Sequence, residues 1–270
     1  MDRYLLRHKP SFTKWASGDH LGRPLYEAAG LSWLRDGGAV TPAVLEVSES
    51  RLVTEYVDEW RPTAESARRL GRMIARMHAS GAPWYGAPPS RYSGPAWIGD
   101  AALKVQQTLP QESKRSWGNF YSRLRIRPYL SDVFDKREQD VIEQLCQALE
   151  SGVLDHDEPE MVRRKGDCVS RIHGDLWSGN VLWGKRGPVL IDPAAQGGHA
   201  EEDLSALRTF GCPYLEQIIA AYQEVSPLAD GWEDRVYLHQ MHILMVHCYL
   251  FGRSYVPRTV EVARNALSLV

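Results

Sequence analysis

Short apolar runs separated by turn residues dominate the first sixty positions of the chain. Two β-rich runs, residues 43–47 and 51–57, flank a Ser48-Glu49-Ser50 turn and predict a hairpin. Before them, residues 23–35 place apolar side chains on one side at helical spacing, and Gly37-Gly38 ends that pattern. The amino-terminal segment therefore predicts a small sheet that carries one helix.

The rest of the chain shows mostly helical periodicity. Residues 64–80 repeat apolar positions at helical spacing behind a Pro62-Thr63 start signal. Further helices are predicted over residues 132–151, 214–225, 232–251 and 258–267. The helix over residues 232–251 is apolar on nearly every face, so we expect it to be buried. The run Glu59-Trp60-Arg61-Pro62 predicts a hinge between a lobe of residues 1–58 and a lobe of residues 59–270.

Composition is ordinary for a globular protein. The 270 residues are 43% hydrophobic and 24% charged, with a formal net charge of -2. A nucleic-acid-binding surface normally leaves a basic excess, so we expect no nucleic-acid partner. No window approaches the roughly 18 apolar residues of a membrane span, and MDRYLLRHKPSF lacks the apolar core of a signal peptide. We expect a soluble cytoplasmic protein without a membrane partner, and both a monomer and a dimer stay open.

The cysteines carry little chemical signal. Cys146, Cys168, Cys212 and Cys248 are widely separated and form no Cys-x-x-Cys pair. Neither a zinc site built on cysteine nor a disulfide framework is expected from this spacing, which fits a reducing compartment.

The strongest chemical signal lies in residues 171–198. Asp175 ends a His-Gly-Asp run, Asn180 follows five residues later, and Asp192 ends an apolar run. Protein-kinase catalytic loops use the spacing H-x-D-x-x-x-x-N followed by a metal-binding aspartate. In that arrangement Asp175 would accept the proton of the attacking hydroxyl, and Asn180 and Asp192 would hold Mg²⁺. The spacing predicts phosphoryl transfer from ATP.

The residues around this motif favour the catalytic interpretation. Residues 181–183 and 189–192 predict two short strands joined by a Gly184-Lys185-Arg186-Gly187 turn. A polar loop that holds two aspartates and an asparagine by chance is the alternative, since Gly-Asp pairs are common in turns. Spacing, strand and turn agree within one short window, which such a loop does not require.

These residues resemble the fructosamine kinase (ketosamine-3-kinase) family, a branch of the aminoglycoside-phosphotransferase and protein-kinase-like superfamily. The most specific match is HGDLWSGNVL, residues 173–182, in which Trp177 is typical of this branch. Weaker matches are residues 70–78, 120–130, 191–194 and 198–204. The resemblance covers most of residues 12–255. It implies an α+β, two-lobed protein-kinase-like fold with a small sheet-plus-helix N-lobe and a mostly helical C-lobe.

The resemblance also assigns roles to residues. It makes Asp175 the catalytic base and makes Asn180 and Asp192 the ligands of Mg²⁺. It implies an ATP-binding set of Lys14, Glu27, Glu55, Tyr56 and Val57. Lys14, in Phe12-Thr13-Lys14, matches the strand lysine that contacts the ATP phosphates, and Glu27 matches its helix partner. A solvated surface lysine is the alternative for Lys14, and an ordinary strand end is the alternative for residues 55–57.

The amino terminus departs from the family pattern. The family places a glycine-containing hairpin ahead of the strand lysine, and that hairpin covers the phosphates. Only eleven residues precede Phe12, and none is a glycine. A shortened lobe, a start upstream of Met1 and impaired nucleotide binding are three open explanations. In addition, Trp97-Ile98-Gly99-Asp100 replaces a Gly-Pro-Leu-Pro-like turn of the family, which leaves substrate specificity open.

The substrate that the resemblance implies is a fructosamine, a small or protein-bound amine carrying a rearranged sugar. Its phosphorylation would serve deglycation repair. Trp177 lies between the proposed base and the proposed metal ligand, so we expect its ring beside the reacting sugar. His173 and Asp203 are further candidate substrate contacts. For Asp203 the alternative is to brace the loop through hydrogen bonds, together with His199 and Glu202.

Three histidines share the apolar helix predicted over residues 232–251. His239 and His242 have the i, i+3 spacing of metal ligands, but zinc needs further nitrogen or sulfur ligands nearby. We therefore favour core or pocket-lining roles for His239, His242 and His247 over a metal site.

Two rival functions stay open. The first is a small-molecule hydroxyl kinase of the aminoglycoside-phosphotransferase type. The second is a catalytically silent nucleotide-binding protein, and the missing glycine hairpin favours it. Asp175, Asn180 and Asp192 speak against the second, because a silent protein has no chemical need for all three.

Overall fold

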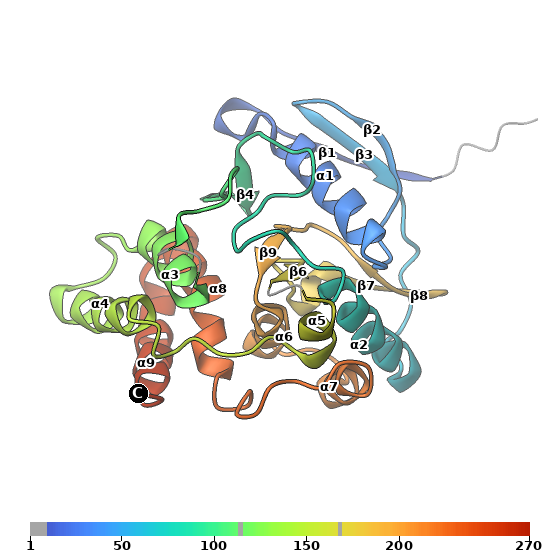
Figure 1. Cartoon of the computed structure of the whole chain (residues 1–270). Helices are drawn as coiled ribbons and strands as arrows, with labels where there is room; N and C mark the ends of the chain where they lie inside the picture. The colour runs from blue at the N-terminus through green and yellow to red at the C-terminus, as the bar shows by residue number, and fades with distance from the viewer. Residues whose placement is uncertain (1–9, 113–115, 167–168) are drawn as a thin grey trace, which may run out of the picture.

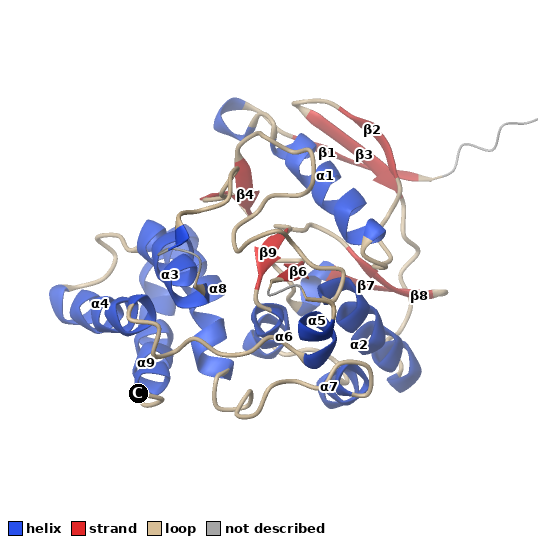
Figure 2. Cartoon of the chain, viewed as in Figure 1, coloured by secondary structure: helices blue, strands red, loops and turns tan. Residues whose placement is uncertain are grey.

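The computed structural model describes residues 10–112, 116–166 and 169–270, so that Cys168 and the first nine residues lie outside the described part. Figure 1 shows a small lobe, with a sheet and one helix, above a larger lobe that consists mostly of helices. This is the α+β architecture that the sequence predicts. Figure 2 shows that the remaining short strands lie between the two groups.

The sheet of the small lobe contains three antiparallel strands in the order β1-β3-β2. Their bounds are β1 (Ser11–Trp15), β2 (Val44–Val47) and β3 (Arg51–Glu55). Helix α1 (Arg23–Asp36) begins with a proline in its first turn and lays Ala28 and Leu31 against Leu52 of the central strand. This contact keeps α1 beside the sheet and therefore orients the side chains of both.

The core of the large lobe forms around α8 (Val236–Phe251), which is buried along most of its length as the sequence predicts. Helices α3 (Trp117–Tyr121), α4 (Lys136–Glu150) and α9 (Val256–Leu267) pack around it. Helix α2 (Ala64–His78) crosses α7 (Leu215–Gln223) closely. A Cβ atom at Gly71 would lie 2.1 Å from the carbonyl oxygen of Ile218.

Short strand pairs carry the residues between the two lobes. They are β4 (Ala96–Ile98) with β5 (Ala101–Leu103), β6 (Ser170–Ile172) with β9 (Gln196–Gly198), and β7 (Val181–Gly184) with β8 (Gly187–Leu190). Helices α5 (Glu160–Arg164) and α6 (Ala200–Thr209) complete the described elements. The strand predicted over residues 189–192 is corrected: β8 ends at Leu190, because Asp192 adopts a left-handed backbone with φ of 55°.

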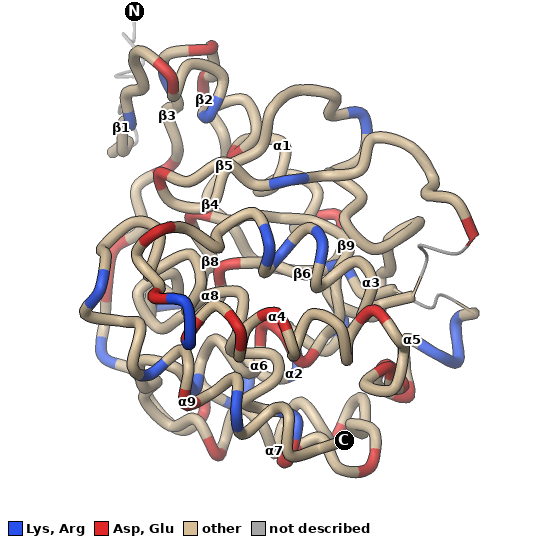
Figure 3. The backbone as a smooth tube through the Cα atoms, turned by 90° about the vertical axis from the view of Figure 1, so that its left-hand side faces the viewer, with Lys and Arg blue, Asp and Glu red and all other residues tan. Residues whose placement is uncertain are grey.

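Charged residues of both signs are mixed along the described backbone, as Figure 3 shows for one side of the molecule. Among the described cysteines, Cys146, Cys212 and Cys248 are free thiols. Within the described residues, each helix is too short or too polar to cross a lipid bilayer.

Candidate active site

The loop between β6 and β7 carries the His-Gly-Asp motif and makes a sharp turn at Gly174. This glycine has φ of 80°, and an added Cβ atom would lie 2.2 Å from the carbonyl oxygen of Ala194. Both the backbone conformation and the space therefore require glycine. The turn brings Asp175 beside the short 3-10 helix Ser178–Asn180.

Asp203 of α6 holds this loop in place through hydrogen bonds. Its two carboxylate oxygens accept hydrogen bonds from the backbone N–H groups of His173, at 2.7 Å, and Gly174, at 2.9 Å. His78 Nε2 lies 3.1 Å from the same carboxylate. Although burial alone raises the pKa of Asp203, these contacts lower it on balance, so the carboxylate stays ionised.

Asn180 fixes the side chain of Asp175. Its Nδ2 donates to the Asp175 carboxylate at 3.0 Å and to the Asp175 carbonyl oxygen at 2.7 Å. The amide oxygen of Asn180 is thereby turned away from Asp175. Burial raises the pKa of Asp175 to about 7, and the hydrogen bond from Asn180 opposes that rise. A carboxylate with such a pKa can accept a proton near neutral pH.

Lys14 connects the small lobe to the end of the catalytic segment. Its ammonium group lies 2.8 Å from Glu27 Oε1 on α1 and also contacts the carboxylate of Asp192. Burial raises the pKa of Glu27, and the charge of Lys14 opposes this. The structure thus brings together one lysine and two carboxylates from three separate elements. The surface-lysine alternative for Lys14 does not predict this arrangement.

Two cavities meet at Glu27 and Asp192, which line both of them. One cavity, of about 240 Å³, lies under the sheet and is lined by Lys14, Glu55, Tyr56 and Val57 of the predicted ATP-binding set. The backbone N–H of Tyr56 already donates to the Pro10 carbonyl oxygen, at 3.0 Å. A ligand in this cavity would therefore contact atoms of residues 55–57 other than the Tyr56 N–H.

The other cavity, of about 250 Å³, is lined by Asp175, Trp177 and Asn180. Its walls come from regions that the motif does not include. These wall residues are Arg23, Trp97, Ile98, Gly99, Ile243, Val246, His247, Leu250 and Phe251. Sequence reasoning singled out residues 97–100 and His247, but it missed Arg23 and the rest of α8. Arg23 pairs with Asp100 at 2.5 Å, a contact between distant segments that has no sequence signal.

Trp177 lies at the edge of this second cavity with 37% of its surface exposed. Its indole packs over Gly179, since an added Cβ atom there would lie 2.2 Å from the ring. The ring also makes an edge contact with Phe210. Trp177 is therefore held against the loop that carries Asp175 and Asn180, and its remaining face is open.

His173 and Asp203 do not line either cavity. The ring of His173 is buried, and its Nε2 lies 2.9 Å from the carbonyl oxygen of Ile191. Asp203 is 1% exposed, and its oxygens are occupied by the loop. The prediction that His173 and Asp203 contact the substrate directly is therefore corrected. The geometry favours the alternative in which Asp203 braces the loop.

Comparisons with known proteins agree on one family. The fructosamine kinase family model matches residues 7–268. The ketosamine-3-kinase of Mus musculus is 27% identical over 251 residues, which cover 86% of this chain and 79% of the mouse protein. A solved structure of a fructosamine-3-kinase homologue from Thermobifida fusca is 39% identical, has a TM-score of 0.81, and is matched over 96% of this chain and 86% of that chain.

A more distant structure shows the wider fold. The choline kinase LicA of Streptococcus pneumoniae is 15% identical and has a TM-score of 0.60, and the match covers 97% of this chain and 87% of that chain. This likeness confirms the protein-kinase-like fold that the sequence resemblance implied. Together with the family match over nearly the whole chain, it shows that the protein is a phosphotransferase that belongs to the fructosamine kinase family.

Proposed function

We propose that the protein transfers the γ-phosphoryl group of ATP to a sugar hydroxyl of a fructosamine. The observation that carries this proposal is the meeting of the two cavities at Glu27 and Asp192. One cavity offers a lysine for phosphates, and the other offers a carboxylate of raised pKa for a hydroxyl. A phosphoryl group that moves from the first cavity to the second passes beside Asp192.

The nucleotide would occupy the cavity under the sheet. Lys14, held by Glu27, would neutralise phosphate charge, and residues 55–57 would lie along the adenine. Asn180 and Asp192 fit a magnesium ion, since Asn180 offers an amide oxygen in the acceptor cavity and Asp192 offers a partly exposed carboxylate where the two cavities meet. When held by these two residues, that ion would supply positive charge that offsets the negative charge developing on the phosphates.

The acceptor would occupy the cavity of Trp177. The carboxylate of Asp175 would accept the proton of the attacking hydroxyl, and Asn180 keeps that carboxylate oriented through its 3.0 Å hydrogen bond. The open face of the Trp177 indole suits the apolar C–H face of a sugar ring. Asp203 and His78 would act only by holding the loop in place.

The substrate class follows from family membership. The mouse relative is named a ketosamine-3-kinase, and we extend ketoamine phosphorylation to this chain. Trp177 and Phe251 line the acceptor cavity and are partly exposed, so a carrier amine would extend past them toward solvent. Small glycated amines are therefore the proposed substrates, and repair of glycated amines is the proposed role.

A substrate panel tests the proposal. ADP formation in the presence of Mg²⁺ should be clear with fructosyl-lysine and much lower with lysine, free fructose or an aminoglycoside. Activity on an aminoglycoside alone would contradict the proposed substrate but leave the kinase activity in place. No ADP formation with any acceptor, although MgATP binds by calorimetry, would instead support the silent nucleotide-binding alternative.

A further inference from the structure

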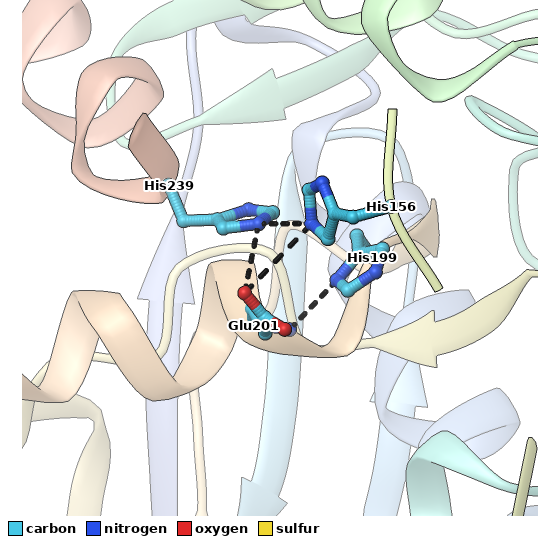
Figure 4. A group of neighbouring side chains, drawn as sticks. All are labelled: His156, His199, Glu201 and His239. Carbon is cyan, nitrogen blue, oxygen red and sulfur yellow. Dashed lines mark hydrogen bonds and ion pairs between the residues drawn. The ribbon is translucent and has the colours of Figure 1, made fainter. Parts of the chain in front are cut away.

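Three histidines and one glutamate meet in the large lobe, away from both cavities of the candidate active site. They are His156, His199, Glu201 and His239, and one ligand atom from each lies within 4.8 Å of all the others. Figure 4 shows the four side chains pointing toward a common centre. The proposed phosphoryl transfer uses none of them.

The separations between their facing atoms are those of a metal-coordination site. His156 Nε2 lies 2.8 Å from His239 Nε2, and Glu201 Oε2 lies 3.3 Å from His239 Nε2 and 3.7 Å from His156 Nε2. Ligands at about 2.0–2.2 Å from a tetrahedral zinc ion are about 3.3–3.6 Å from one another. A shift of a few tenths of an ångström would bring these three atoms to that spacing.

Neighbouring groups hold the ligand atoms in the required state. His156 Nδ1 lies 2.8 Å from the Leu154 carbonyl oxygen, and a proton on Nδ1 leaves the lone pair of Nε2 facing the cluster. His199 Nε2 lies 3.2 Å from the Asp157 carbonyl oxygen, and its Nδ1 accepts a hydrogen bond from the backbone N–H of Glu201 at 3.2 Å, which a bound metal would replace. The side chains of His199 and His239 are fully buried and that of His156 is 9% exposed, and such burial disfavours the charged form of each ring.

His239 can change its tautomer without breaking a hydrogen bond at Nδ1. Its Nε2 is next to the unprotonated Nε2 of His156, so without a metal the proton of His239 lies on Nε2. Its Nδ1 is buried and has no hydrogen-bond partner among the described residues. Metal binding would move the proton from Nε2 to Nδ1, which frees a lone pair for the metal and releases no proton.

We propose that His156, His199, Glu201 and His239 bind one divalent transition-metal ion of the zinc class. Three imidazole nitrogens and one carboxylate oxygen suit zinc and not magnesium, which prefers oxygen ligands. Arg235 holds the carboxylate of Glu201 through contacts of 2.7 and 3.0 Å, and Glu158 lies 3.9 Å from His199 Nε2. These contacts orient the ligands.

The ion would join three parts of the large lobe that are distant in sequence. His156 lies between α4 and α5, His199 and Glu201 lie at the start of α6, and His239 lies on α8. Two residues beyond Glu201, α6 also carries Asp203, which holds the catalytic loop. The proposed role is therefore structural.

Zinc titration of the full chain tests this proposal independently of kinase activity. After removal of metals with EDTA, the protein should bind one Zn²⁺ per chain in a buffer containing excess Mg²⁺, and its Tm should rise. Bound Co²⁺ should give the visible absorption of a tetrahedral complex. Metal content is measured by elemental analysis after dialysis.

The variants H156Q and H239Q should lower zinc affinity by more than about 100-fold, because changes outside the ligand set alone cost about 10–100-fold. H242Q is the matched control, since His242 is buried on the same helix but outside the cluster. D192N controls for zinc at the proposed magnesium site. Both controls should retain the ion.

Absence of zinc binding by the parent protein would overturn the proposal, as would equal binding by H156Q. H156Q changes a residue outside the helices, so that the test stands even where H239Q fails to fold.

Discussion

The indole of Trp177 lies directly over the α-carbon of Gly179, two residues further along the same loop. An alanine at position 179 would place its Cβ atom 2.2 Å from the ring, and the half-exposed ring would have to move. Gly179→Ala should therefore raise KM for the glycated acceptor several-fold and leave KM for ATP near the parent value. Steady-state kinetics with both substrates measures this.

A double substitution shows whether the effect of Gly179→Ala passes through the ring. In a Trp177→Ala background, Gly179→Ala should have little further effect, because the group that it displaces is gone. Full additivity of the two substitutions would contradict this interpretation.

Replacement of the proposed base should separate chemistry from binding. Asp175→Asn keeps the shape of the side chain but cannot accept a proton, and loss of a general base costs on the order of 10²–10⁴ in rate. MgATP affinity should stay within a few-fold, since Asp175 lines the acceptor cavity and not the cavity of Lys14. Turnover at the parent rate in this variant would exclude Asp175 as the base.

Activity should fall on the acidic side of neutrality. Because the pKa of Asp175 is raised to about 7, the ionised form that accepts a proton is populated above that pH and lost below it. The pH profile of kcat/KM for the acceptor should show this acidic limb. A profile that stays flat from about pH 5 to 8 would mean that a group other than Asp175 accepts the proton of the hydroxyl.

The two proposed magnesium ligands should differ in strength. A charged carboxylate binds a hard divalent ion more strongly than an amide oxygen does, so Asp192→Ala should weaken MgATP binding more than Asn180→Ala. Calorimetric titration of MgATP measures both. Unchanged binding by Asp192→Ala would contradict its role.

Removal of Lys14 should act on the nucleotide alone. Lys14→Ala deletes the cation that joins Glu27 and Asp192, so KM for ATP should rise while KM for the acceptor changes little. Arg51→Ala on the same sheet is a suitable control, since Arg51 lies outside both cavities. Equal kinetics for the Lys14 variant and the parent would show that Lys14 is a solvated surface lysine.

Local signals explain why most helices could be predicted. Thr63 and Ser66 form the capping box that begins α2, and Asp135 and Glu138 form the one that begins α4. The apolar faces of α8 predicted its burial. In contrast, β4 and β5 have three residues each, too few to show a period, and α6 begins at a capping side chain of His199 that no common start signal includes.

The spacing of the motif predicted which residues of the catalytic segment would meet, because they flank one hairpin, β7–β8. Contacts between distant segments were not accessible in the same way. The i, i+3 spacing of His239 and His242 suggested a pair, but His242 packs against Tyr129 and His239 faces His156 and His199. Such groupings depend on how helices pack, which single-sequence patterns do not encode.

The wall of the acceptor cavity includes Arg23 at the start of α1, the end of β4 with the turn after it, and one side of α8, whereas Asp175, Asn180 and Asp192 come from the segment between β6 and β9. Substitutions in the wall can thus accumulate without changing the groups that move the phosphoryl. Evolution of a new acceptor preference in this scaffold would require only local drift at residues 97–100 and along α8.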